Sequence, residues 1–139
     1  MHSILPLPAR LTLLALLTMA TLPAGAALPG DVARGRALLL QRQDSGCILC
    51  HVLPGLPPGG ALGPPLVDLA RRYDSDALRL RIADARSVNP DTVMPPYFST
   101  EGLRNVARSR AGLTVLSEQA LADIVAYLLA APGPDDDRR

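Results

Sequence analysis

Two cysteines three residues apart, followed directly by a histidine, constrain this chain more than any other feature. Cys47, Cys50 and His51 form the spacing C-x-x-C-H, the signature of covalent c-type haem attachment. Side chains three positions apart lie on one side of a helical turn, so both sulfurs can form thioethers with the vinyl groups on one haem edge. The imidazole of the next residue can then bind the iron axially. The motif therefore predicts a domain folded around one covalently bound haem c.

Three other uses of a C-x-x-C pair compete with haem attachment. A redox-active dithiol normally belongs to a βαβ context, and no strand pattern appears in this sequence. A structural zinc ion needs four ligands, whereas residues 28–139 hold two cysteines and one histidine. A disulfide between Cys47 and Cys50 would close a small, strained loop. Haem attachment is the preferred interpretation, and a thiol module without haem is the alternative.

The second axial ligand of the iron is predicted by elimination. Residues 28–139 contain no second histidine and no lysine, and Met94 is the one methionine among them. Met94 lies in a proline-rich loop, where a side chain can be held on the opposite side of a haem from His51. A lone methionine is more often a core filler, but no other strong-field ligand exists here. Ligation by His and Met raises the reduction potential relative to two histidines.

An axial histidine needs an acceptor that holds its other ring nitrogen. The stretch Gly63-Pro64-Pro65-Leu66 offers carbonyl oxygens in a stiff loop, because proline fixes its own φ. We predict that the Pro64 carbonyl, rather than that of Pro65, accepts from Nδ1–H of His51. The alternative is that both prolines only stiffen the loop.

The first 27 residues have the pattern of a cleavable signal peptide. A weakly basic start holding Arg10, an apolar stretch from Leu11 to Met19 and a run of small residues at 24–27 are typical of such a leader. We predict cleavage after Ala26 or Ala27 and export to the periplasm, with a cytochrome domain over 28–131 and a flexible tail over 132–139. A membrane helix needs about twenty apolar residues, so no stable membrane insertion is expected, although an uncleaved anchor is the alternative.

The charge pattern argues against a nucleic-acid partner. All fourteen basic residues of the chain are arginine, and in residues 28–139 the arginines balance the acidic residues without forming a basic stripe. Aromatic residues make up only 3% of the chain, and these normally supply the largest blocks of apolar area to a core. A small domain built mainly on Leu, Val and Ala is marginal. A large flat cofactor at its centre would compensate.

Periodicity and capping residues predict three helices and no strands. The helices run from Asp31 to about Gln43, from Asp74 or Ser75 to about Arg86, and from an N-cap at Ser117 to a stop at Pro132. Proline- and glycine-rich loops separate them. The expected buried stripes are Ala33, Ala37 and Leu40; Leu78, Ile82 and Ala85; and Leu121, Ile124, Val125 and Leu128. Gly35 costs helix stability, so either another helix crosses there closely or the glycine is tolerated at the surface.

With these motifs in hand, the chain resembles the class I cytochromes c over its whole length after residue 27. That family has an N-terminal helix crossing a C-terminal helix, a G-P-x-L sequence after the haem motif and a distal Met-Pro loop. The resemblance implies an all-α class I cytochrome c fold, with three to four helices around one haem. The matching residues here are Gly35, Gly63-Pro64-Pro65-Leu66, Met94-Pro95 and Ile124-Val125-Ala126-Tyr127-Leu128.

A narrower resemblance is to the small monohaem subunit, SoxX, of the sulfur-oxidation (Sox) cytochrome complex SoxAX. The stretch Asn89-Pro-Asp-Thr-Val-Met-Pro-Pro-Tyr97 is the most specific match. The others are Gly46-Cys-Ile-Leu-Cys-His51, Leu78-Arg-Leu-Arg-Ile82, Leu116-Ser-Glu-Gln119 and Asp123-Ile-Val-Ala-Tyr-Leu128.

This second resemblance implies an electron-accepting component of a thiosulfate-oxidising complex. In that family the larger haem protein of the complex, SoxA, acts as an L-cysteine S-thiosulfotransferase, coupling thiosulfate to a cysteine of the carrier SoxYZ. A small acceptor cytochrome is a further expected partner. The resemblance also implies that the active haem of SoxA has a cysteine as its iron ligand. This chain has no third cysteine, so no catalytic site of that kind is expected in it. A freely diffusing monohaem cytochrome, or a haem subunit of another periplasmic dehydrogenase or oxidase, is the alternative.

Apolar residues flank the motif and the Met94 loop, and an apolar patch is what a stable interface uses. We therefore expect a docking collar for the larger haem subunit around the haem edge. The alternatives are that these side chains fold inward, or that the partner docks on the Arg104–Arg110 segment. The collar would comprise Ile48, Leu49, Val52, Leu53, Pro54, Pro95, Pro96 and Tyr97.

Overall fold

The computed structural model describes residues 28–53 and 55–131, so the predicted signal peptide over 1–27 and the tail over 132–139 lie outside the described residues. Within the described ranges the chain is helical and has no strand. None of these helices is long and apolar enough to cross a membrane. The elements are α1 (Val32–Leu39), α2 (Cys47–Cys50), α3 (Leu69–Arg72), α4 (Ser75–Ala83), the 3-10 turns η1 (Ala85–Ser87) and η2 (Arg108–Arg110), and α5 (Glu118–Ala130).

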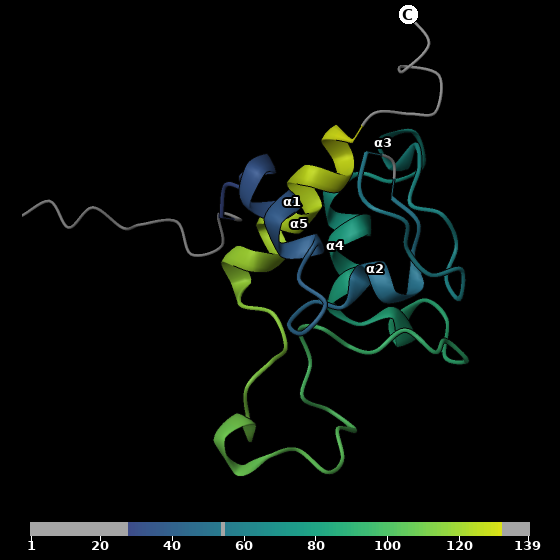
Figure 1. The fold of residues 1–139 in the computed structure, drawn as a ribbon. Coiled ribbons are helices and arrows are strands. Elements are labelled where there is room, and N and C mark those ends of the chain that lie inside the picture. Colours follow the sequence, from purple (N-terminus) through teal and green to yellow (C-terminus); the bar gives the residue numbers. More distant parts are fainter. Residues whose placement is uncertain (1–27, 54, 132–139) are drawn as a thin grey trace, which may run out of the picture.

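Helices α1 and α5 cross each other and make the most extensive contact between any two helices (Figure 1). Gly35 is buried at this crossing. A Cβ atom at Gly35 would overlap the backbone carbonyl oxygen of Asp123 and lie 2.7 Å from its carbonyl carbon. Real Cβ atoms do not approach this closely. Of the two alternatives for Gly35, the close crossing is therefore the one present, and it explains a glycine inside a helix.

A buried carboxylate of α5 fastens the crossing. Asp123 is only 2% exposed, and its oxygens accept from the backbone N–H of Asp31 at 2.7 Å and from Nε of Arg34 at 2.8 Å. The Gln119 side chain donates a further bond at 2.9 Å. Buried charge is tolerated when it is paired and hydrogen-bonded, so Asp123 ties the N-terminal segment to the last helix.

The predicted stripe of the last helix is confirmed. Leu121, Ile124, Val125 and Leu128 are all buried, and the Ser117 hydroxyl accepts from the Ala120 N–H at 3.1 Å, as an N-cap should. In the middle helix Leu78, Ile82 and Ala85 are buried as expected. That helix ends earlier than predicted, at Ala83, because the Asp84 side chain accepts from the Arg86 N–H and starts the 3-10 turn η1.

The buried face predicted for the first helix is wrong. Ala33 and Ala37 are exposed, and Gly35 and Leu39 take their place against α5. The helix also stops at Leu39 instead of near Gln43. The buried hydroxyl of Ser45 donates to the Leu38 carbonyl at 2.6 Å and satisfies this end of the helix. Tertiary packing has overridden a weak alanine pattern here.

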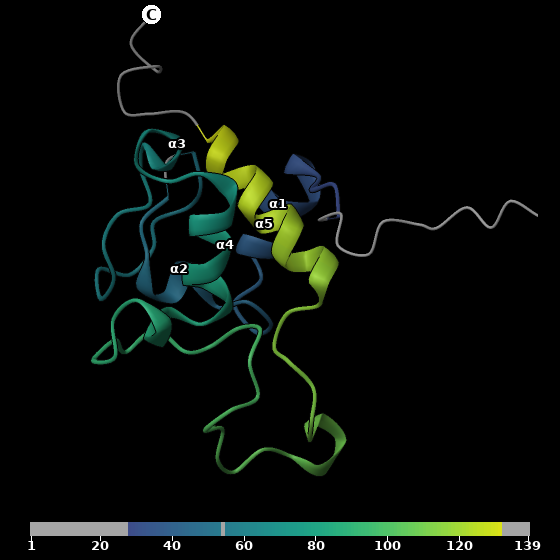
Figure 2. The ribbon, with the colours of Figure 1, turned by 180° about the vertical axis from the view of Figure 1, so that it is seen from behind.

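A long loop leaves the body between Phe98 and Leu116. We call residues 100–115 the arm. The hydrophobic core includes Tyr97, Phe98 and Leu116 but no residue between 99 and 115. Figures 1 and 2 show the arm projecting from the helices, with η2 at its far end.

Candidate functional site

The C-x-x-C-H motif forms a single helical turn and its exit. Helix α2 consists of Cys47–Cys50 alone, and the chain enters it through Gly46, whose φ of 63° suits glycine. The His51 N–H donates to the Cys47 carbonyl at 3.0 Å, and beyond it the backbone is extended. Both cysteines and His51 line the same cavity. One helical turn therefore brings both cysteines to a single cavity.

The glycine- and proline-rich loop that follows runs back along this turn. The Gly60 N–H donates to the Ile48 carbonyl at 3.0 Å, and the Gly63 N–H donates to the Cys50 carbonyl at 2.8 Å. A Cβ atom at Gly60 would overlap the carbonyl oxygen of Leu49, so only glycine permits this close approach. The loop therefore supports the motif through its backbone.

The imidazole of His51 has a defined orientation. Its Nδ1 lies 2.7 Å from the Pro64 carbonyl oxygen, and because a carbonyl only accepts, Nδ1 must carry the hydrogen. In the neutral imidazole this tautomer leaves the lone pair on Nε2. Gly63 lies directly against the ring, and a Cβ atom there would be 2.6 Å from Nδ1. The carbonyl chosen from the sequence thus occupies the position that its predicted role requires, while the role itself stays a prediction.

A cavity of about 530 Å³ lies in front of the motif. This volume is within the ordinary range for cofactor sites, about 300–1,000 Å³. Met94, the predicted distal ligand, lines the cavity together with His51 and Pro64. Its backbone is held in the loop by a 3.1 Å bond from the Met94 N–H to the Thr92 hydroxyl. Core side chains form the rear wall: Leu39, Leu69, Leu78, Ile82, Ile124 and Leu128.

Two arginines give this apolar cavity a cationic side. Arg72 and Arg81 both line it, next to Tyr73. The Arg81 guanidinium lies 4.4 Å from the centre of the Tyr73 ring, and that of Arg72 lies 5.7 Å from it. The described residues supply neither arginine with a salt-bridge partner. Asp91 is the one acidic residue among the lining side chains, so this side could hold the carboxylates of an anionic cofactor.

The cavity suits a large flat apolar group with carboxylate substituents. It brings together two adjacent sulfurs, an imidazole held by Pro64, a thioether at Met94 and two arginines. A c-type haem needs vinyl-reactive thiols, axial nitrogen and sulfur ligands and an apolar wall. The residues present fit that group.

The alternatives to haem attachment receive little support from the geometry. Cys47 and Cys50 are not joined in a disulfide. Burial raises the pKa of the Cys47 thiol, whereas a redox-active dithiol depends on a lowered thiol pKa. In the part of the chain that the structure describes, no three His, Cys, Asp or Glu side chains converge as a metal-binding group. Burial likewise raises the pKa of Tyr97, so its phenol stays protonated beside Cys47.

The predicted docking collar is wrong for half of its members. Ile48, Leu53, Pro96 and Tyr97 are buried and belong to the interior. Leu49, Val52 and Pro95 remain exposed, and Pro54 lies outside the described residues. The inward alternative therefore holds for these four, and Ile48, Leu53 and Tyr97 belong to the hydrophobic core.

Sequence reasoning missed the cationic wall and the Asp123 network. The cationic wall combines Arg72 at the end of α3, Tyr73 directly after it and Arg81 in α4. These side chains come together only in the folded protein. Their signal in the sequence was weak, because arginines are spread throughout this chain. Asp123 had a clearer signal, since a carboxylate beside Ile124 in an apolar stripe needs a buried partner.

The fold is that of a class I cytochrome c. In a comparison with solved structures, the chain is similar to one in the crystal structure of SoxXA from P. pantotrophus. The two share 24% sequence identity and superpose with a TM-score of 0.67, over 76% of this chain and 86% of that chain. No family model and no curated protein matches the sequence. At this identity the likeness establishes the fold, and the function has to be inferred from the site.

Proposed function

We propose that this chain is a monohaem c-type cytochrome that accepts and transfers electrons. The observation that carries the proposal is that Cys47, Cys50, His51 and Met94 line one apolar cavity at the centre of a cytochrome fold. Cys47 and Cys50 would hold a haem covalently, and His51 and Met94 would supply its axial ligands. When bound, haem supplies a one-electron Fe(III)/Fe(II) couple.

The protein's own residues orient and shield this site. The Pro64 carbonyl accepts the Nδ1 hydrogen of His51 and so presents Nε2 as the free donor atom. The loop hydrogen bond at Thr92 positions Met94. The buried leucines and isoleucines behind the cavity exclude water, and a dry apolar setting raises a haem potential. Because Cys47, Cys50 and His51 would all be committed to holding the haem, we assign the chain no catalytic site of its own.

We further propose that the chain is the electron-accepting component of a thiosulfate-oxidising complex of the SoxAX type. The sequence resemblance around Asn89–Tyr97 and the fold likeness to a chain of SoxXA support this assignment. Its partners would be a larger haem subunit, the SoxYZ carrier acting through that larger protein, and a small acceptor cytochrome. The protein would reach the periplasm through a signal peptide over residues 1–27.

The haem proposal is tested by expressing the full chain in a periplasm that carries out c-type cytochrome maturation. We expect one haem to be retained after denaturation, as measured by mass spectrometry and by the reduced haemochrome spectrum. The variant Cys47→Ala/Cys50→Ala should lose the covalent haem. A purified wild-type protein without a Soret band would leave the thiol module as the better interpretation.

The assignment to a complex is tested separately, by co-purification. The holoprotein should bring down a larger haem subunit from the periplasm of its own cells, and its haem should become reduced when thiosulfate and the carrier are added. Retention of haem without a bound larger partner would instead support a freely diffusing cytochrome.

A further inference from the structure

The arm has a net positive charge, although the protein as a whole is nearly neutral. The whole chain has a formal net charge of +1. The arm holds Arg104, Arg108 and Arg110 against a single acidic residue, Glu101. It therefore contributes a net +2, and the remainder of the chain is slightly negative. Such asymmetry gives the arm a local positive potential that the overall charge conceals.

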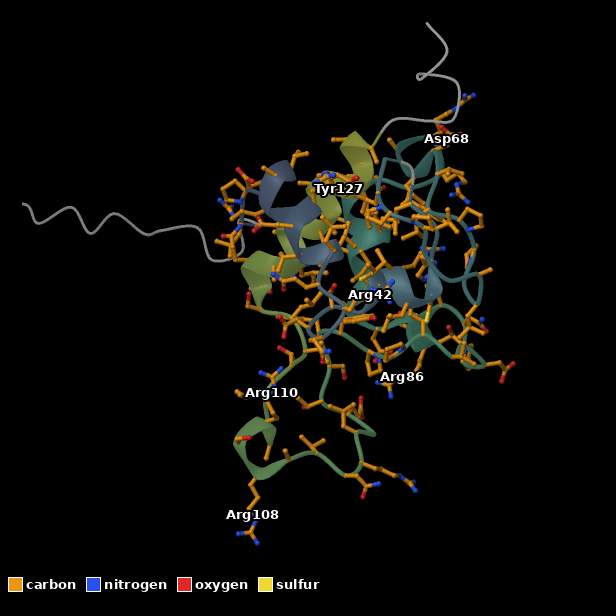
Figure 3. The ribbon with its side chains drawn as sticks, viewed as in Figure 1. Arg42, Asp68, Arg86, Arg108, Arg110 and Tyr127 are labelled. Carbon is orange, nitrogen blue, oxygen red and sulfur yellow. The ribbon has the colours of Figure 1, made fainter. Side chains whose placement is uncertain are left out.

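The arginines of the arm face solvent. Every residue from Glu101 to Leu113 is exposed, and Figure 3 shows the Arg108 guanidinium at the far tip, directed away from the body. The salt bridges of the described residues use Arg34, Arg79 and Arg86 and none of the arm arginines. Internal ion pairing therefore does not account for this charge.

Apolar side chains accompany the arginines along the arm. Leu113 is 55% exposed, and Leu103, Val106 and Val115 are between 37% and 40% exposed. The 3-10 turn η2 makes no extensive contact with any helix of the described chain. Interface cores are rich in apolar side chains, and arginine is the charged residue that interfaces favour. Four exposed aliphatic residues on one projecting loop suit contact with another protein.

The base of the arm is fixed to the site. The Leu116 N–H donates to the Tyr97 carbonyl at 2.9 Å, and the Phe98 N–H donates to the Ala83 carbonyl at 2.9 Å. The Arg86 guanidinium donates to the Glu101 carbonyl at 3.0 Å. Tyr97 lines the cavity with Met94. Because the arm begins three residues after Tyr97, it starts close to the Met94 side of the cavity. A loop of this length is uncommon unless it is functional or disordered. The hydrogen bonds that hold the two ends of the arm favour a functional role.

We propose that the arm is a docking element for an acidic protein surface with a shallow apolar groove. The arginines would face carboxylates of the partner, and the leucines and valines would enter the groove. This inference rests on the proposed function, because the partner we assign is the larger haem subunit of the complex. Docking there would set the partner beside the Met94 edge of the cavity instead of on the predicted collar.

The test uses full-length holoprotein immobilised at one site and the larger haem subunit from the same cells as the probe. We expect R108E/R110E to weaken binding at least about tenfold, mostly through slower association. The wild-type affinity should fall as NaCl rises from about 0.05 to 0.3 M, and that of the variant much less. Leu113→Ser should weaken binding while keeping the salt dependence of the wild type.

A matched variant controls for net charge. R36E/R71E changes the same number of charges at two exposed arginines outside the arm, and it should bind within about twofold of wild type if steering is local. The Soret spectrum and reduction potential should be the same in all variants, because no altered residue lines the cavity.

Each other outcome overturns the docking proposal in a distinguishable way. If the wild type binds the larger haem subunit and R108E/R110E binds it equally well, the docking role of the arm is refuted and the proposed function is unaffected. No binding by wild type would refute the assignment to the complex and the docking role together. Arm-dependent binding to phosphatidylglycerol vesicles, or arm-dependent self-association in sedimentation, would assign the arm to a lipid surface or a second copy if partner binding is unaffected.

Discussion

Replacing Gly35 by alanine gives the sharpest test of the α1–α5 crossing, because helix propensity and steric overlap change the free energy of unfolding in opposite directions. Alanine in place of glycine inside a helix is worth about 1 kcal/mol of added stability. The new methyl group would overlap the Asp123 carbonyl oxygen and lie 2.9 Å from the Cβ of Tyr127. Overpacking typically costs about 1–3 kcal/mol. Here the obstacle is backbone, which cannot rotate aside as a side chain can.

Relief of the overlap requires α1 and α5 to separate, and that would lengthen the bonds from Asp31 and Arg34 to Asp123, now 2.7 and 2.8 Å. A hydrogen bond to a charged group contributes about 1.5–3 kcal/mol. Combining a steric cost near the upper end, partial loss of one such bond and the helix gain, we expect Gly35→Ala to destabilise the protein by about 2–3 kcal/mol.

The assay is guanidinium unfolding of the holoprotein, followed by far-ultraviolet circular dichroism. For a domain of this size each kcal/mol moves Tm by about 4–8 °C, so the loss is measurable thermally as well. Ala37→Gly, at an exposed position of the same helix, should cost about 1 kcal/mol from propensity alone. A Gly35→Ala protein as stable as wild type, or more stable, would refute the close crossing.

Three further predictions concern acid stability, core packing and the distal ligand. The hydrogen bond from Arg34 lowers the pKa of Asp123 to about 2, so the ionised carboxylate stabilises the fold above pH 4, and this stabilisation is lost as pH falls from about 4 to about 2. Allowing for the exposure of Arg34, Asp123→Asn should remove about 1–2 kcal/mol of that pH-dependent stability. A difference in Tm between wild type and variant that stays constant from pH 2 to pH 5 would contradict this. Leu121→Ala, at a residue with no exposed surface, should cost about 2–5 kcal/mol by urea unfolding, and a loss under about 1 kcal/mol would mean the site repacks freely. Met94→Ala should leave haem attached, lower its potential in a redox titration and abolish the weak near-infrared band of thioether-ligated ferric haem, whose survival would show that another group is the ligand.

Local signals made much of the fold predictable. The last two long helices begin at caps, Asp74 and Ser117, that act on their own first turns, and their apolar stripes are unambiguous. The first helix was harder, because alanines such as Ala33 fit a core or a surface equally well. Its true face was decided by how closely α5 approaches Gly35, which is a tertiary property.

The candidate site also has a part that local signals predict and a part that depends on tertiary structure. The positions of Cys47, Cys50 and Pro64 around His51 follow from short-range spacing and loop stiffness, and the structure brings these residues together. The collar depended on which side of the chain faces outward, and neighbouring residues such as Val52 and Leu53 differ completely in burial. Exposure in an irregular loop has no periodicity from which it could be predicted.

The Asp31–Asp123 contact also bears on the order of folding events. It joins residues 92 positions apart, and closing a loop of that length costs about 4 kcal/mol in chain entropy. Contacts between distant residues form slowly compared with local helices, and this one is possible only after α5 has been synthesised. Until then the turn at Cys47–His51 remains outside a closed core. A long-range contact of this kind therefore makes the closing of the core a late event in folding, and the Cys47–His51 turn becomes enclosed only at that stage.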